Sequence, residues 1–150
     1  MQRYDLSCIK QHPYIAAYDG ELLGPLAEAP QIESDNKMSD SLIYENGGAE
    51  EIGKTLLRNT ARITLKTKNI ETALNLIAKF SSGDDVIAAA LRKPLSFTPI
   101  TDNESEKVLT FHCAALLPDL EYLPGMGQDH VATIIFIAYP DENGKLFTYA

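Results

Sequence analysis

The sequence predicts a mainly β domain of the α+β class, with a single helix beside its strands. Three observations support this class. Short apolar runs alternate with turn residues in the N-terminal third, one central segment has helical spacing, and the C-terminal third is rich in β-branched and aromatic residues. The 150 residues are the size of one ordinary domain, and no linker, repeat or low-complexity tract divides them. We therefore expect one domain over residues 1–150.

The N-terminal third is expected to form short strands. Residues 6–9 and Tyr14–Tyr18 are apolar runs, and an Asp-Gly pair follows the second. Residues 22–23 form another run before a Gly-Pro pair. Residues 31–38 are sparsely apolar and are typical of a strand that buries little on either face.

Residues 39–59 show neither a strand nor a helix period and are expected to form a long hairpin loop. Such loops are uncommon in compact domains and are usually functional or disordered, but a disordered segment would be more polar. We expect this loop to pack on its own domain or on a neighbouring copy, and we interpret it as an inter-subunit interface. The apolar residues that would form this interface are Leu42, Ile43, Tyr44, Ile52, Leu56 and Leu57.

The clearest strand and the helix follow one another directly. Residues 61–66 alternate apolar and polar side chains, as in a strand with one solvated face. Asn69 is a good N-cap and Glu71 falls in the first turn, so a helix is expected over residues 69–80 on the flank of the domain. The predicted core face of this helix consists of Ile70, Leu74, Ile77 and Phe80.

The second half is expected to be mostly strands. Runs at residues 86–91, 95–97 and 107–117 suit strands, and residues 130–139 are the strongest candidate because they are β-branched and aromatic. An Asn-Gly pair at 143–144 supplies turn residues before a last apolar run at 146–149. We expect these last two runs to form a closing hairpin.

The composition limits the possible functions. A net charge of −8 argues against a function in nucleic-acid binding, because such binding depends on basic residues that neutralise phosphates. No stretch approaches the roughly 20 apolar residues of a membrane helix, so no membrane segment is expected and the protein should be made in a cytoplasm. Cys8 and Cys113 lie in partly apolar segments and are expected to be buried thiols.

No catalytic, metal or cofactor site is expected. His112 and Cys113 are adjacent, and neighbours on a strand point to opposite faces, so they do not suit one metal ion. No serine lies in a Gly-x-Ser-x-Gly motif. The Gly-Met-Gly run at 125–127 lacks the third glycine and the following helix of a phosphate loop. The acidic pairs at 50–51 and 84–85 each have a glycine within two residues and are interpreted as solvated charge.

The order of parts resembles the major tail-tube protein of tailed bacteriophages, a family related in fold to the tube protein of type VI secretion systems. The strand TARITLKT at 60–67, which leads into the helix, is similar to the strand and acidic-starting helix of that family. The segment FIAYPDENGKLF at 136–147 resembles its C-terminal Asp-Gly hairpin. The likeness covers nearly the whole chain.

The resemblance implies a β-sandwich or barrel-like domain, six copies of which close into a ring. Rings would stack into a hollow tube of a virion tail that conducts DNA, with other tail proteins at the tube ends. Six chains of −8 give a ring charge of −48, and acidic walls would let DNA pass without specific binding.

Alternative functions remain open from the sequence. A tail terminator or a secretion-type tube protein would have the same fold. A small monomeric ligand-binding β-domain, with residues 39–59 folded over a pocket, belongs to a different class, as does an enzyme with scattered catalytic residues.

Overall fold

The computed structural model describes residues 13–34, 36–45, 48–80, 91–101, 106–119 and 121–150. The strand expected at residues 6–9 and most of the one at 86–91 lie outside this part of the chain. Eleven strands and one helix lie within it. The larger sheet contains nine strands: β1 (Tyr14–Tyr18), β2 (Glu21–Leu22), β3 (Gln31–Ser34), β6 (Ala61–Thr67), β7 (Lys93–Pro99), β8 (Leu109–Leu116), β9 (Glu121–Leu123), β10 (Val131–Tyr139) and β11 (Thr148–Tyr149). A second sheet contains only β4 (Lys37–Glu45) and β5 (Gly48–Arg58).

The nine-stranded sheet is antiparallel and is not closed into a barrel. Its strand order is β2-β1-β7-β8-β10-β6-β3, with β11 beside β8 and β9 beside β10. The path therefore ends at β2 and β3, which do not pair with each other. The mainly β prediction is confirmed, and the closed form of the barrel-like alternative is excluded.

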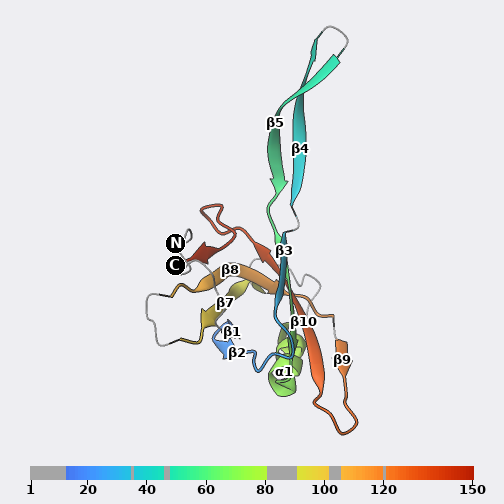
Figure 1. Cartoon of the computed structure of the whole chain (residues 1–150), viewed down its shortest axis with the longest axis vertical. Helices are drawn as coiled ribbons and strands as arrows, with labels where there is room; N and C mark the ends of the chain where they lie inside the picture. Colours follow the sequence, from blue (N-terminus) through green and yellow to red (C-terminus); the bar gives the residue numbers. More distant parts are fainter. Residues whose placement is uncertain (1–12, 35, 46–47, 81–90, 102–105, 120) are drawn as a thin grey trace, which may run out of the picture.

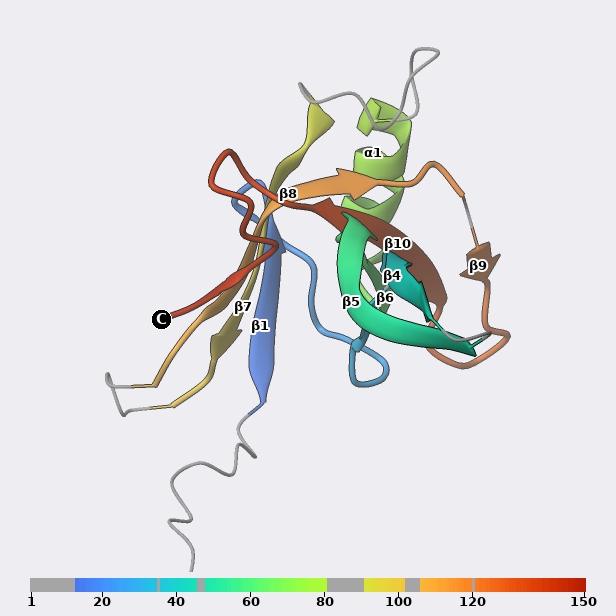
Figure 2. The same ribbon diagram turned by 90° about the horizontal axis from the view of Figure 1, so that it is seen from above.

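Strand β8 is the corner at which the sheet folds over itself. On one side it pairs with β7, from Phe97↔Leu109 to Lys93↔Ala114, and on the other side its second half pairs with β10, from Cys113 to Leu116. Figure 2 shows β1 and β7 running together across the direction of β10. The ring of Tyr18 on β1 consequently meets that of Phe136 on β10, with centroids 4.7 Å apart, although β7 and β8 separate these strands in the sheet. The half of the sheet that contains β1 and β7 therefore packs face to face on the half that contains β10, as the two layers of a β-sandwich do.

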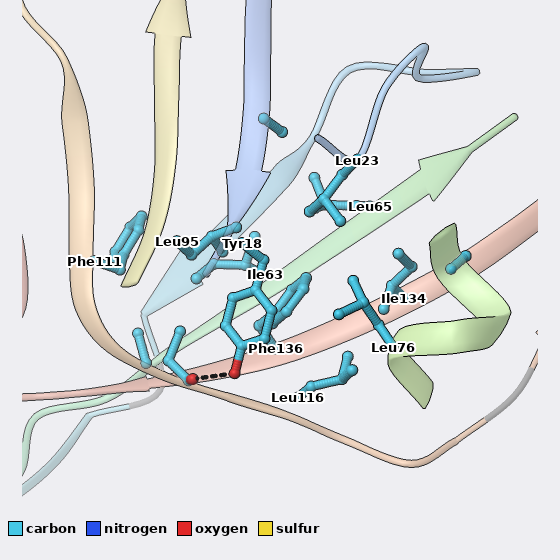
Figure 3. Packing of buried hydrophobic residues seen from close by; sticks show 14 of the residues in the cluster. Tyr18, Leu23, Ile63, Leu65, Leu76, Leu95, Phe111, Leu116, Ile134 and Phe136 are labelled. Carbon is cyan, nitrogen blue, oxygen red and sulfur yellow. Dashed lines mark hydrogen bonds between the residues drawn. The ribbon is translucent and has the colours of Figure 1, made fainter. Parts of the chain in front are cut away.

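The core lies between the two halves of the folded sheet. On β6, the inward side chains from Ala61 to Thr67 are buried and Arg62 is exposed, which confirms the predicted alternation. Thr67 is polar, but its hydroxyl donates a hydrogen bond to the carbonyl of Leu23. The Tyr18 hydroxyl likewise donates to the carbonyl oxygen of Ala114 at 2.8 Å (Figure 3). Polar groups in this core are therefore paired.

Helix α1 (Ile70–Phe80) begins where the sequence predicted. The Asn69 Oδ1 accepts a hydrogen bond from the backbone N–H of Thr72 at 3.4 Å, as an N-cap does. Glu71 in the first turn and Lys79 in the last turn complement the helix dipole. The side chain of Phe80 lies outside the described residues.

The buried face of α1 differs from the predicted one. Ile77 is buried and Ile70 packs partly buried against the core, but Leu74 keeps 36% of its surface exposed. Ala73 and Leu76 are fully buried instead, and Leu76 lies beside Ile134 in Figure 3. At about 100° per residue, Leu74 and Leu76 lie equally far to either side of the direction midway between Ala73 and Ile77, so helical spacing alone does not decide which of the two is buried. The predicted burial of Leu74 is wrong, and Leu76 was missed.

The end of the chain also differs from the expected hairpin. A turn forms as predicted: Asp141 Oδ1 accepts hydrogen bonds from the backbone N–H groups of Asn143 and Lys145, both at 2.9 Å. However, β11 pairs with β8 and not with β10. The reason is that β10 already pairs with β6 along one edge and with β8 and β9 along the other. The last strand extends the sheet where β8 still has a free edge.

Candidate assembly interface

Residues 39–59 form most of a long β-hairpin, which corrects the expectation of a segment without strand period. Strands β4 and β5 pair from Lys37↔Arg58 to Glu45↔Gly48. The register shifts twice, after Lys37 and after Ser41, so that β5 has an extra residue at each shift. Such bulges reverse the alternation of faces along a strand, which explains why no period was visible in the sequence.

The hairpin continues the β3–β6 pair of the body. The two strands pair as far as Ser34↔Ala61, and Asn36 Oδ1 then accepts a hydrogen bond from the backbone N–H of Thr60 at 3.2 Å. Beyond this point β4 and β5 extend away from the body along the longest axis of the molecule (Figure 1). The body therefore fixes the direction in which the hairpin starts.

The projecting part pairs with no other strand of the described residues. Nine residues of β4 span about 30 Å, and β4 and β5 have each other as their main contact. An isolated two-stranded hairpin is marginally stable in water at best, and each of its two outer edges carries unpaired backbone groups. This geometry is typical of an element that is stabilised by a neighbouring molecule.

The predicted interface residues all lie on this hairpin. Leu42↔Glu51, Ile43↔Glu50 and Tyr44↔Ala49 are cross-strand pairs near its outer end, and Leu56 pairs with Met38 near the base. The two extra residues of β5 are Ile52 and Leu57, since the pairing passes over both of them. The backbone thus places the six residues along one ribbon, at positions that the sequence alone did not relate to one another.

A second surface feature is a hollow of about 740 Å³ in the body. One side of the hollow is formed by residues 25–32, which lead into β3. The other side is formed by the ends of β1, β7, β8 and β11. Its lining is mostly apolar and includes Tyr14, Leu26, Ile32, Phe97, Ile100 and Tyr149. Sequence reasoning missed this hollow because its lining comes from five separate parts of the chain.

The residues considered for catalysis or metal binding are held in separate contacts. His112 Nε2 lies 2.9 Å from the Thr148 hydroxyl, and His130 Nδ1 hydrogen-bonds the hydroxyl of Tyr122. No group of three or more His, Cys, Asp or Glu within the described residues is arranged to hold a metal ion. Cys113 is a free, partly buried thiol. His12 and the acidic pair at 84–85 lie outside the described residues.

The Gly-Met-Gly run at 125–127 lies in the connection between β9 and β10. Gly127 has a φ of +76°, and a Cβ on Gly125 would lie 2.5 Å from the carbonyl oxygen of Gln128. Both glycines are therefore explained by backbone geometry. In the described part of the chain, no helix is long and apolar enough to span a membrane.

Comparison with known proteins identifies the fold. No protein-family model and no curated protein sequence matches the chain. Among solved structures, a chain of the virion of the native gene transfer agent particle is similar with a TM-score of 0.57 and 12% identity, over 91% of this chain and 95% of that one. The sheath/tube terminator of PVC, an extracellular contractile injection system, in its extended state has a TM-score of 0.50 and 14% identity, over 95% and 96%.

A more distant similarity, with a TM-score of 0.41 and 16% identity, is to the Dit protein of phage SPP1, over 83% of this chain and 49% of that one. The two stronger similarities cover nearly the full length of each chain. The chain therefore has a phage tail-tube-like fold, as the resemblance predicted.

Proposed function

We propose that this chain is a structural subunit of a phage tail, which assembles with copies of itself into rings of six that stack as a hollow tube. The β4–β5 hairpin is the observation that carries this proposal. It extends about 30 Å and pairs with no other strand in the described part of the chain. The shared fold with virion and tube-terminator chains supports the same class of protein.

The hairpin suits contact with a second copy of the chain. Burial of its six apolar interface residues against a neighbour would contribute about 25 cal/mol per Å² of apolar area. The acceptor on the neighbour would be a surface other than the hairpin itself. Such a head-to-tail contact produces a closed ring when the rotation between neighbouring subunits adds up to a full turn. When it does not, the contact repeats along an axis.

The charge of the chain suits a conduit for DNA. Six copies of −8 sum to −48, and acidic walls repel phosphates instead of holding them. In this proposal the subunit is part of the virion tail, is made in a bacterial cytoplasm, meets other tail proteins at the tube ends, and uses neither catalysis nor a cofactor.

The test is to remove the hairpin at a point that the register defines. Lys37 and Arg58 are a cross-strand pair, so replacing residues 38–57 by Asn-Gly closes the ribbon with a two-residue turn. We expect a folded body by circular dichroism, because the larger sheet and its core are left intact. We also expect loss of rings or tubes by sedimentation and negative-stain microscopy.

Two outcomes would contradict the assembly role. A shortened chain that still builds rings or tubes would show that the hairpin is dispensable for assembly. A shortened chain that unfolds would show that the hairpin supports its own domain. The full-length protein at the same concentration is the matched control.

A tail terminator is the second candidate. The observation that favours it is the similarity to a sheath/tube terminator over 95% of this chain. Microscopy of the concentrated full-length protein separates the candidates, because a terminator should stop at single rings whereas a tube subunit, of a tail or of a secretion-type system, should stack further. A monomer at all concentrations would favour the ligand-binding β-domain.

A further inference from the structure

The hollow in the body is an open apolar surface to which the proposed role of the hairpin assigns no function. Large side chains from three separate segments remain exposed on it: Ile32 is 42% exposed, Ile100 51% and Tyr149 41%. Single exposed hydrophobic residues are normal, but three that converge on one hollow indicate a binding surface. Its volume of about 740 Å³ lies within the roughly 300–1,000 Å³ that is typical of ligand pockets.

The lining of the hollow suits an apolar and polarisable side chain. Three aromatic residues line it, namely Tyr14, Phe97 and Tyr149. Glu28 is the one charged residue among its described lining residues, and its carboxylate already pairs with Lys66 Nζ at 3.5 Å. A thioether sulfur contacts aromatic rings favourably, at about 5 Å from the ring. A methionine from another molecule is therefore a well-suited occupant.

The chain itself presents such a methionine on the loop between β9 and β10. Met126 is 98% exposed, and Leu123, where β9 ends, is 62% exposed. They are the two most exposed large hydrophobic residues in the described part of the chain, and together they form what we call the knob. Two such residues on one loop make a small apolar patch that a second molecule can bury.

Contacts at the base of this loop restrict the position of the knob. The Tyr122 hydroxyl hydrogen-bonds His130 Nδ1 across the loop, and the two rings meet edge to face with centroids 5.6 Å apart. Lys68 Nζ, between β6 and α1, lies 3.0 Å from the Asp129 carboxylate. A preorganised loop loses less conformational entropy on binding than a flexible one.

The knob and the hollow lie on different sides of the body. In Figure 1 and in Figure 2, β9 lies on the right, whereas the C-terminus, next to Tyr149 of the hollow, lies on the left. The knob therefore does not fill the hollow of its own chain, but one copy can offer its knob to the hollow of the next. A contact between two different surfaces is head-to-tail, which is the kind of contact that closes rings.

We propose that the hollow binds the knob of a second copy of this chain, with Met126 seated among the aromatic rings. The inference rests on the proposed self-assembly and adds a contact to that of the hairpin. The charges beside the two surfaces are opposite: Glu121 starts β9, and Lys107 Nζ lies 5.6 Å from the centroid of the Tyr149 ring. Opposite charges steer two surfaces together and fix their register.

The experiment is a disulfide cross-link between chains. Cys8→Ser with Cys113→Ala removes both native thiols. Met126→Cys and Ile100→Cys then place one thiol on the knob and one in the hollow. The matched control pairs Met126→Cys with Asn75→Cys, on the exposed face of α1. Under mild oxidation of the assembled protein, we expect chains linked in series on non-reducing gels at least about tenfold faster for the first pair than for the control.

A second measurement tests whether this contact contributes to assembly. Met126→Asp places a charge on the knob, and the circular dichroism spectrum should stay that of the wild type because Met126 is so exposed. We expect the concentration for half-assembly to rise at least about tenfold, since burying an unpaired charge opposes the contact. Asn75→Asp adds the same charge to α1 and should leave this concentration unchanged.

The outcomes separate this inference from the proposed function. Assembled rings or tubes in which both pairs cross-link equally slowly would overturn the knob contact and leave the proposed assembly standing. The same holds if Met126→Asp assembles like the wild type. Disulfides within one chain would show that the knob reaches its own hollow, against the proposal. A protein that stays monomeric at all concentrations would contradict both the knob contact and the proposed function.

Discussion

Tyr18 lies at the centre of the core, and its hydroxyl offers a sharp test of how the folded sheet is held. The side chain is fully buried, its ring contacts Phe136, and its hydroxyl donates to the carbonyl oxygen of Ala114 at 2.8 Å. Tyr18→Phe keeps the ring and removes the hydroxyl. Since the carbonyl of Ala114 then loses a buried partner, we expect the free energy of unfolding at pH 7 to fall by about 1–3 kcal/mol.

The same hydroxyl gives a pH dependence with a definite sign. Burial, followed by the charge of Asp19, raises the pKa of Tyr18 from its ordinary value of 10.0 to about 12. The unfolded chain therefore loses the phenolic proton first, and the folded protein loses stability as the pH rises from about 10 towards 12. One proton contributes a slope of at most about 1.4 kcal/mol per pH unit in this window. Below pH 10 this contribution is constant.

Urea unfolding of the dilute full-length protein between pH 7 and pH 11.5 measures both effects. Tyr18→Phe should have lower stability at pH 7 and a shallower loss above pH 10 than the wild type. Tyr139→Phe is the matched control, because Tyr139 is a partly exposed residue of β10 whose ring stays under the Arg92 guanidinium, with Cζ 3.9 Å from the ring centroid. Its effect should be below about 0.5 kcal/mol. Identical stability and slope for the two variants would refute the role assigned to the buried hydroxyl.

Three further changes test other parts of the structure. Leu76→Ala should lower the free energy of unfolding by about 2–5 kcal/mol whereas Leu74→Ala should lower it by about 1 kcal/mol or less, and the reverse order in urea melts would restore the face predicted from sequence. Ile52→Thr together with Leu57→Thr, at the two bulges of β5, should reduce the sedimenting assembled fraction with an unchanged circular dichroism spectrum; unchanged assembly would place the contact elsewhere. Asp141→Ala should cost about 1 kcal/mol because two backbone N–H groups lose their acceptor, and thermal melts that match the wild type would show the turn to be held by other contacts.

Local patterns in the sequence predicted the elements that have one buried and one solvated face. The alternation from Ala61 to Lys66 predicted β6, and Asn69 with the three-and-four spacing after it predicted the start of α1. These signals are visible without a structure because the apolar residues of a buried face recur every second residue in a strand and every three to four residues in a helix. The mainly β class and the placement of a turn after Tyr139 follow from the same kind of local evidence.

The tertiary structure alone decided which faces and edges are used. Leu74 and Leu76 are both leucines of one helix, and only the position of the sheet determines that Leu76 is buried. The last strand pairs with β8 because the edges of β10 are already occupied by strands distant in sequence. The hairpin was hidden because its two bulges break the alternation, and the hollow was hidden because five segments build it. A sequence records the periodicity of each element, but edges, bulges and shared cavities depend on which elements become neighbours.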